Sequence, residues 1–506
     1  MLPSAPVARP DLSDVLRPPG ELLRTRRAVA AAAAGLAAVA GVVRLLARPG
    51  RPMWFDESVT VALARYPLRA ILGQLVGAEV SGGPYTLLLH ALLRVTDPLG
   101  LDALAVGRGA SLAFGAATVP LLFLAGRRLV GDRAALLAAG LLAVGRFHVY
   151  YSLEARGYAL AVLLVVLSTG ALLALLERPR AAPALAFGAL AALATWAHLF
   201  AAFVLAAQGL SALRHPGIRR AARWLGAGLA LGGAGSAVVL VIAARGDAGQ
   251  VGWIAPLSWK QVATVFVNLV GGARLLLLPA AAGSIAAAVA TREEGARGFG
   301  ATLALAWALL PIALAVAVSV AKPLLVPRYL LVALPGFALL VAVGVQALRR
   351  PRLVAAAALL ALALSGREVA RSGDAEPAWQ PIDQVARRLL AAARPGDALV
   401  VSHPGLAVTL DRELARLGRA PWPERVEPLP GDPLALLPGP RQTIEDRLAG
   451  RTGVVFVLFA ERADAARARA AFAAGARVTD DEELRGIRLL RLERPAPAPA
   501  GPAVAP

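Results

Sequence analysis

The chain has 506 residues, of which 58% are hydrophobic, a mean hydropathy of +0.63 and a formal net charge of +20. Such a charge on a soluble chain would suggest a nucleic-acid partner, but here the cations are concentrated in short segments between long apolar runs. A spanning helix needs about 20 apolar residues, and many runs approach that length. Orientation in the bilayer explains these cations better than a nucleic-acid partner does, and the composition predicts a polytopic α-helical membrane protein that binds no nucleic acid. The absence of cysteine excludes disulfides and thiolate chemistry.

Residues 1–27 are polar and proline-rich and contain several arginines near their end. We expect this tail to be cytoplasmic, because cytoplasmic segments next to spans are rich in Lys and Arg. The apolar run that follows is too long for a cleavable signal peptide and predicts a retained span. About eleven spans are expected, with the N-terminus inside and the C-terminus outside: 28–46, 103–126, 134–147, 157–176, a helical pair within 183–213, 222–243, 273–290, 299–320, 329–347 and 353–366.

The spans define a membrane domain over residues 28–370, with a first outer loop at 48–102. In that loop, 57–76 predicts an amphipathic surface helix, and 84–95 is too short to cross and is expected in the interface. From residue 371 to 494 the composition is that of a soluble chain and predicts a small extracytoplasmic α/β domain. Its expected elements are strands at 397–401, 453–459 and 487–492 and a helix at 460–474; the Pro-Ala tail 495–506 is expected to be disordered.

Two adjacent carboxylates, Asp56 and Glu57, follow the first span directly. They could belong to a solvated loop, but Trp54 and Phe55 before them are residues that hold a loop at the membrane interface. A carboxylate at such a boundary can act as a general base or ligate a divalent cation. The dipeptide therefore predicts a candidate site on the outer face.

A second acidic stretch returns to the same face after two more spans and contains Glu154, Arg156 and Tyr158. Glu154 could simply pair with a neighbouring arginine on a loop surface. Alternatively, it supplies a second acidic group facing the first, while Arg156 and Tyr158 hold a phosphate or a hydroxyl. Both interpretations remain open from the sequence.

Two cations, Lys322 and Arg328, lie on a late outer loop, and Tyr329 follows them. Snorkelling explains either cation individually. Their position outside opposes the positive-inside trend, which favours an anionic ligand such as a lipid phosphate. His148 and His198 lie near predicted span ends. A histidine there is either a substrate contact or a helix-end residue whose ring nitrogens are hydrogen-bonded within the protein.

Together these stretches resemble the GT-C superfamily of polytopic glycosyltransferases, and most closely the branch with protein O-mannosyltransferases and the lipid A aminoarabinose transferase. The resemblance covers roughly residues 28–370. It rests on Trp54-Phe55-Asp56-Glu57, on Tyr151-Ser152-Leu153-Glu154-Ala155-Arg156-Gly157-Tyr158, and on Pro327-Arg328-Tyr329-Leu330 with Pro335.

The resemblance implies transfer of a hexose or pentose from a polyprenyl-phosphate donor to a lipid, glycan or protein acceptor, at the outer face of a bacterial cytoplasmic membrane. Asp56 would be the base, and Glu57 and Glu154 would shape the site. Arg328, with Lys322 and Arg156, would neutralise the departing lipid phosphate. No nucleotide cofactor is needed, which agrees with the absence of a phosphate-binding loop motif.

Many members of the superfamily carry a His-Pro-Pro stretch after the first outer helix, whereas this chain has Ser81-Gly82-Gly83-Pro84-Tyr85 there. A divalent cation (Mg²⁺ or Mn²⁺) held by Asp56 and Glu154 remains an expectation of the resemblance. Two other functions stay open: a catalytically inactive scaffold in cell-envelope assembly, and a lipid or solute transporter. A transporter would show internal repeats and ionisable residues within its spans, and neither is evident.

Overall fold

The chain forms two compact units, residues 1–49 with 75–374, and residues 50–74 with 375–506. The structure is a computed structural model. It describes residues 25–47, 53–77, 81–245, 254–375, 382–392, 394, 397–401, 404–418, 425–426, 453–459, 477–484 and 486–493. The expected helix at 460–474 and tail at 495–506 lie outside the described residues, as do residues 1–24 of the predicted cytoplasmic tail.

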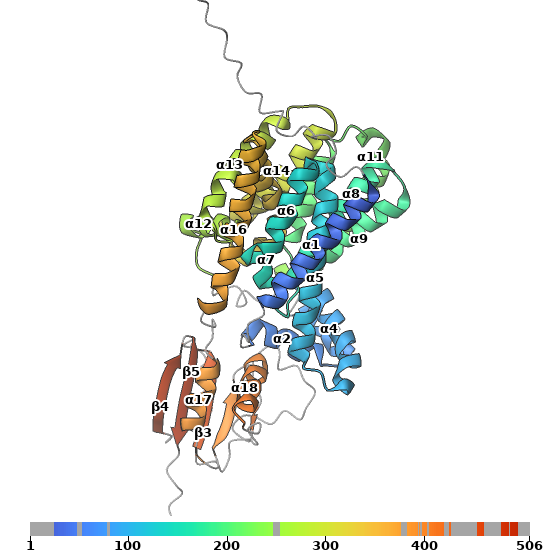
Figure 1. Cartoon of the computed structure of the whole chain (residues 1–506). Coiled ribbons are helices and arrows are strands. Elements are labelled where there is room, and N and C mark those ends of the chain that lie inside the picture. The colour runs from blue at the N-terminus through green and yellow to red at the C-terminus, as the bar shows by residue number, and fades with distance from the viewer. Residues whose placement is uncertain are drawn as a thin grey trace, which may run out of the picture. The chain divides into compact units, whose positions relative to one another are not determined.

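The first unit is a helical bundle (Figure 1). Its helices are α1 (Arg26–Leu46), α4 (Gly83–Thr96), α5 (Ala103–Val130), α6 (Asp132–Val144), α7 (Arg146–Tyr151), α8 (Tyr158–Glu177), α9 (Ala181–Ala197), α10 (Ala201–Ala212), α11 (Ile218–Arg245), α12 (Trp259–Leu269), α13 (Leu277–Ala290), α14 (Gly295–Ala321), α15 (Leu334–Gln346) and α16 (Pro351–Ala375). Short 3₁₀ turns are η2 (Asp97–Leu99), η4 (Arg274–Leu276) and η5 (Pro327–Ala333).

Every segment predicted to span the membrane is helical in the structure. Among the described residues, seven helices are long and apolar enough to cross a membrane, or up to eight if one bent pair counts as a span. That pair is 259–269 with 274–290, bent by 91°. The remaining predicted spans coincide with the shorter helices α6, α9 and α10. The sequence therefore located the helices correctly, while their lengths support fewer full crossings than the expected eleven.

Close backbone contacts hold the bundle together. Helix α15 is buried on all sides and packs against α13, where Gly283 faces Leu340. A Cβ at Gly283 would overlap the carbonyl oxygen of Leu340, so only glycine permits this approach. Small residues at helix contacts are expected in lipid, because lipid provides no hydrophobic drive for association and van der Waals packing must replace it.

The segment between α1 and α5 differs from its prediction. The expected single surface helix at 57–76 is two helices, α2 (Phe55–Ala64) and α3 (Leu68–Gly77). Pro67 separates them, because proline disfavours the helical conformation of the preceding residue. Val59 and Leu63 of α2 are buried to 5% and 2% exposure, so α2 is not a freely exposed surface helix.

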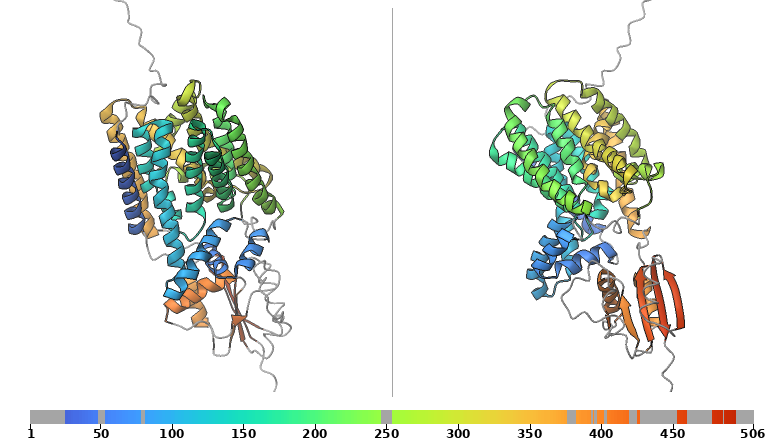
Figure 2. Two further views of the ribbon diagram at one scale, coloured as in Figure 1. Left: turned by 90° about the vertical axis from the view of Figure 1, so that its right-hand side faces the viewer. Right: turned by 180° about the vertical axis from the view of Figure 1, so that it is seen from behind.

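The second unit contains a five-stranded sheet with the order β2-β1-β3-β5-β4. Strand β1 is parallel to β2 and β3, and β5 is antiparallel to β3 and β4. Its elements are α17 (Ile382–Ala392), β1 (Ala398–Val401), α18 (Pro404–Arg416), β2 (Arg425–Val426), β3 (Gly453–Phe459), β4 (Arg477–Leu484) and β5 (Ile487–Glu493). Figures 1 and 2 show the sheet from in front and from behind.

Helices α17 and α18 cover one face of the sheet, with a core that includes Val385, Leu410 and Leu489. The three predicted strands correspond to β1, β3 and β5, so the α/β prediction is correct for the described part of this unit. Strand β4 was not predicted, because its sequence RVTDDEEL is acidic and lacks apolar alternation. Charged side chains of this kind are common on edge strands, where they prevent further pairing.

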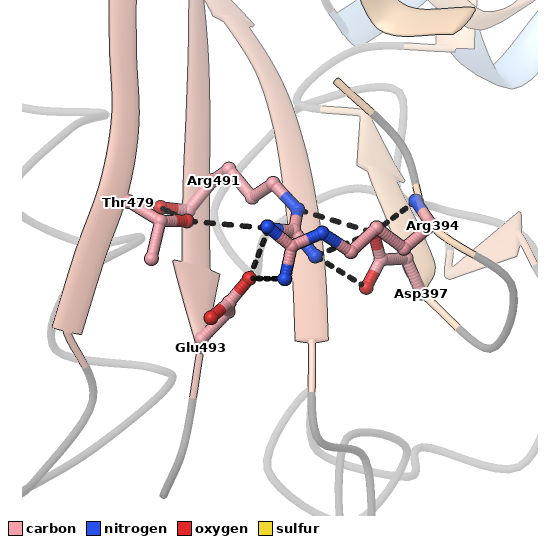
Figure 3. Close-up of polar contacts among 5 residues, drawn as sticks. All are labelled: Arg394, Asp397, Thr479, Arg491 and Glu493. Carbon is pink, nitrogen blue, oxygen red and sulfur yellow. Dashed lines mark hydrogen bonds and ion pairs between the residues drawn. The ribbon is translucent and has the colours of Figure 1, made fainter. Parts of the chain in front are cut away.

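A polar network crosses this sheet around Arg491 (Figure 3). Its guanidinium donates to Asp397 at 3.2 and 3.3 Å and also to Glu493, while its side chain is only 5% exposed. Asp397 additionally accepts from the backbone N–H of Arg394 at 2.7 Å. The network pairs a buried cation with two carboxylates, as a stable buried charge requires.

Candidate functional site

The second acidic stretch forms a tight loop between α7 and α8. Glu154 is 5% exposed, and its carbonyl oxygen accepts from the N–H of Arg156 at 2.8 Å. The hydroxyl of Ser111 on α5 donates to the Tyr85 hydroxyl at 2.9 Å, and its oxygen lies 3.4 Å from the carbonyl oxygen of Arg156. Gly157 closes the loop, since a Cβ there would lie 3.0 Å from the Ala197 carbonyl oxygen. The loop is therefore tied to α4, α5 and α9.

Aromatic rings connect this loop to two distant parts of the sequence. The ring of Tyr158 lies 5.1 Å from that of Tyr151 and 5.5 Å from that of His198. The His198 ring in turn lies 5.3 Å from that of Tyr329, over which the Arg328 guanidinium sits at 5.4 Å. The contacts bring together the α7–α8 loop, the break between α9 and α10, and the start of η5. We call this set, with Glu154 and Arg156, the aromatic–arginine cluster.

Charges in the cluster act on its titratable groups. Burial lowers the pKa of His198 to about 3, and the charges of Arg156 and Arg328 contribute in the same direction. The imidazole is therefore neutral at pH 7. Burial raises the pKa of Tyr151 well above its usual range, with Glu154 raising it further and Arg328 opposing. One carboxylate and two guanidiniums thus lie within electrostatic range of these two rings.

A buried atom of His198 is available for hydrogen bonding. His198 is 7% exposed, and its Nδ1 has no hydrogen-bond partner among the described residues. A buried polar atom without a partner is costly. In this cluster, it marks a position where a ligand or water could complete the bonding.

Asp56 and Glu57 lie in the other unit, in the first turn of α2. Glu57 is fully buried, and its side chain accepts from the Trp54 N–H at 3.4 Å, which satisfies a donor at the helix N-terminus. Asp56 is partly exposed, and carboxylates in a first turn are stabilised by the helix dipole. The two adjacent acids therefore have different surroundings: Glu57 supports the helix, and Asp56 remains accessible.

Other predicted site residues lie elsewhere. His148 is 1% exposed and its Nδ1 is 2.7 Å from Nη2 of Arg44, so its ring is engaged by α1. Lys322 is exposed at the end of α14. The structure thus brings together Glu154, Arg156, Tyr158, His198, Arg328 and Tyr329, and adds Tyr151. The sequence analysis did not single out Tyr151 as a site residue, although it lies three residues before Glu154 in the quoted motif.

A metal site was expected from Asp56 and Glu154. Across the ranges described above, no group of three or more His, Asp or Glu side chains could hold a metal ion. Mg²⁺ keeps several waters and usually takes one or two carboxylates from the protein. Asp56 and Glu154 belong to different units, and a cation held by this pair stays a prediction.

The fold resembles solved membrane proteins. ArnT from Cupriavidus metallidurans, bound to undecaprenyl phosphate, aligns with a TM-score of 0.55 at 16% identity, over 90% of this chain and 97% of that chain. Its apo form gives a TM-score of 0.54 at 16% identity, with the same 90% and 97% coverage. The archaeal oligosaccharyltransferase AglB from Archaeoglobus fulgidus, in complex with an inhibitory peptide and a dolichol-phosphate, aligns with a TM-score of 0.50 at 13% identity. The alignment covers 84% of this chain and 69% of that chain.

No protein-family model matches the sequence, and no match was found among curated proteins. The structural likeness nonetheless confirms the expected fold class. The chain is a polytopic, multi-pass α-helical membrane protein whose fold is similar to those of ArnT and AglB.

Proposed function

We propose that the protein is a membrane glycosyltransferase that moves a sugar from a polyprenyl-phosphate donor to an acceptor hydroxyl on the extracytoplasmic face. Solved structures of ArnT and AglB, whose folds are similar to this one, contain undecaprenyl phosphate and a dolichol-phosphate respectively. The proposal also places the protein in a bacterial cytoplasmic membrane with its N-terminus inside, following the arginine distribution along the sequence.

The aromatic–arginine cluster is the observation that carries the proposal. Arg156 and Arg328 come from segments more than 170 residues apart, and both act on His198. His198 is neutral, so no imidazolium adds to their charge. Guanidiniums bind phosphate through paired hydrogen bonds. Two arginines beside tyrosines and a buried, neutral imidazole therefore suit an anionic headgroup that carries a sugar.

The reaction requires one bond to form and one to break. The acceptor hydroxyl oxygen attacks the anomeric carbon of the sugar, and the bond from that carbon to the phosphate oxygen breaks. The phosphate leaves as a polyprenyl monophosphate with one more negative charge, and the hydroxyl proton passes to a carboxylate. Fixed cations directed at developing negative charge are most effective away from water.

We assign the residues as follows. Asp56, the accessible acid of α2, accepts the acceptor proton. Arg156 and Arg328 stabilise the leaving phosphate, assisted by Lys322. Glu154, Tyr158, Tyr329 and the Nδ1 atom of His198 supply hydrogen bonds to the sugar. Glu57 keeps α2 in place through its bond to Trp54.

The test is transfer by the purified protein in nanodiscs. A panel of radiolabelled polyprenyl-phosphate hexoses and pentoses is supplied with membrane extract as acceptor, and release of polyprenyl phosphate is measured. We expect turnover with at least one donor. Asp56→Asn should lower kcat by about 10²–10⁴-fold, the usual contribution of a general base. The donor that reacts identifies the sugar.

Asp383→Asn serves as the matched control. Asp383 also lies in the first turn of a helix, α17, and should leave transfer unchanged. Equal turnover in Asp56→Asn and wild type would remove Asp56 from the mechanism. No turnover with any donor and acceptor extract would contradict the transferase function and favour a scaffold.

A further inference from the structure

Arg44 is a buried cation in an otherwise exposed span. Most of the side chains of α1 are exposed, yet Arg44 near its C-terminal end has 0% exposure. Its Nη1 donates to the carbonyl oxygens of Ala40 at 3.0 Å and Ala143 at 3.3 Å, and its Nη2 lies 2.7 Å from Nδ1 of His148. One side chain thus links α1 to the end of α6 and to α7.

The partner atoms determine the state of His148. A guanidinium only donates, so Nδ1 of His148 must accept and the ring proton is on Nε2. Burial lowers the pKa of His148 well below its usual range, and the charge of Arg44 lowers it further, so the ring is neutral. Nε2 has no hydrogen-bond partner among the described residues. The backbone of Leu142 also hydrogen-bonds to the ring and opposes this lowering of its pKa. Arg44 is the side-chain partner that orients the ring among the described residues.

Packing alone does not fix the ring. His148 borders a cavity of about 30 Å³ whose other walls include Gly145, Gly271 and Ser365. That volume is enough for roughly one water molecule. With free space beside it, the imidazole could take another orientation if the bond to Arg44 were lost.

Arg44 also lacks the partner that buried arginines normally have. Within the described residues it forms no ion pair with a carboxylate, and its Nε has no hydrogen-bond partner. The carbonyl of Ala143 lies in the last turn of α6, where the helix dipole is negative and partly compensates the charge. A buried cation with such incomplete compensation is less favourable than an apolar side chain of similar size. Its presence points to a role beyond packing.

The path from this pair to the acidic loop is short. The carbonyl oxygen of His148 accepts from the N–H of Ser152 at 3.0 Å and from its hydroxyl at 2.5 Å. Ser152 lies two residues before Glu154 and packs against Gly115 of α5, where a Cβ would overlap its hydroxyl. The contact leaves no room for Ser152 to adjust. Arg44 also binds the backbone carbonyl of Ala143 at the α6–α7 junction. Loss of Arg44 would therefore release backbone as well as the ring just before the loop that carries Glu154 and Arg156.

We propose that Arg44 and His148 are positioning residues that hold the Glu154–Arg156 loop in its working geometry. Their effect on catalysis rests on the proposed glycosyl transfer, whereas their effect on the loop does not. The two readouts below separate these claims.

The first readout is amide hydrogen exchange over residues 152–157, which is independent of any activity. In Arg44→Met and in His148→Phe, we expect exchange of this loop to be about tenfold faster, because its local opening becomes easier. Arg44→Lys keeps the positive charge but loses the planar guanidinium that binds several acceptors at once. Its loop should therefore exchange at a rate between those of wild type and Arg44→Met. The double variant should be no faster than the more affected single variant, since both act through one contact.

The second readout is transfer kinetics. Arg44→Met should lower kcat/KM for the donor about tenfold or more, because the displaced loop carries Arg156 and Glu154, which are assigned to the phosphate and the sugar. Gln208→Met is the matched control: Gln208 is 1% exposed in the same unit and donates to Ser168 and Thr169 at 2.8 and 2.9 Å. It should affect thermal stability without changing loop exchange or the ratio of kcat to KM.

If exchange of the loop is unchanged in Arg44→Met, the inference is overturned, whatever the transfer assay gives. If Arg44→Met does not fold, unchanged exchange in Arg44→Lys has the same meaning. Exchange that rises equally in Gln208→Met would also overturn it, because the effect would then be general loosening. Faster loop exchange in a protein whose wild type shows no transfer would support the inference and contradict the proposed function alone.

Discussion

The membrane unit and the C-terminal sheet each bury an arginine, and the two guanidiniums have different surroundings. Arg491 of the sheet has Asp397 and Glu493 around it and is satisfied by carboxylates (Figure 3). Arg44 of the bundle has two carbonyl oxygens and a neutral imidazole, with no carboxylate among the described residues. A fully paired buried charge contributes to a fixed structure. A buried charge without a carboxylate partner costs stability, and we therefore associate Arg44 with function rather than with stability.

Removing Arg491 should give the largest effect on stability. Arg491→Met leaves Asp397, at 5% exposure, buried without its cation, which should cost about 3–5 kcal/mol. Glu493 is 29% exposed and keeps its contact to Arg394 at 2.8 Å. Hydrogen exchange of the sheet strands measures the loss. Arg388→Met is the control, since Arg388 is 62% exposed and its 3.5 Å contact to Glu482 should contribute under about 1 kcal/mol. A loss as small as the control would contradict a structural role for the network.

The bundle should instead depend on its close helix contacts. Gly283→Ala forces a methyl group into the Leu340 carbonyl and should cost about 1–3 kcal/mol through displacement of α13 from α15. Gly170→Ala on α8 is the control: no atom lies within 4 Å of its new Cβ, so stability should stay the same or rise by up to about 1 kcal/mol. Thermal unfolding in detergent distinguishes the two. Equal melting temperatures would show that α13 and α15 need no such contact.

The prediction with the smallest effect concerns pH. The pKa of His198 is about 3 in the folded protein and about 6.5 in an unfolded chain. Because the folded value is depressed, the unfolded chain binds the extra proton, and stability falls as pH drops below about 6.5 towards 3. The slope should reach at most about 1.4 kcal/mol per pH unit.

Melting temperatures of wild type and His198→Phe between pH 5 and 7.5 test this dependence. The difference between the two proteins should change below pH 6.5 and stay constant above it. A difference that is constant over the whole range would show that His198 is not held neutral.

The sequence was sufficient for the fold but only partly for the site. Long apolar runs and arginine-rich loops identified the helices of the bundle, because hydropathy reports directly on burial in lipid. Other features depend on local backbone geometry or on contacts between elements distant in the sequence, and hydropathy does not report on these. Pro67 split a predicted helix, and the acidic strand β4 is stabilised by its pairing with β5 rather than by an apolar pattern. Arg44 resembles any cation near a span end, and only the packed structure reveals its burial.

The candidate site was likewise predictable only in part. Glu154, Arg156, Arg328 and Tyr329 were proposed from short motifs, and the structure places them in one cluster with His198. Asp56 and Glu57 are adjacent, and in the sequence only the family resemblance gives them different roles. Their different burial on α2 distinguishes them.

The central claim is that the guanidiniums of the aromatic–arginine cluster hold a lipid-linked phosphate. Its most direct test is the affinity of the purified protein for undecaprenyl phosphate in nanodiscs, compared between wild type, Arg328→Gln and the exposed-cation control Lys260→Gln. We predict binding about tenfold or more weaker in Arg328→Gln, corresponding to about 1.4 kcal/mol or more, and unchanged in Lys260→Gln. Equal affinity in all three proteins would contradict the claim.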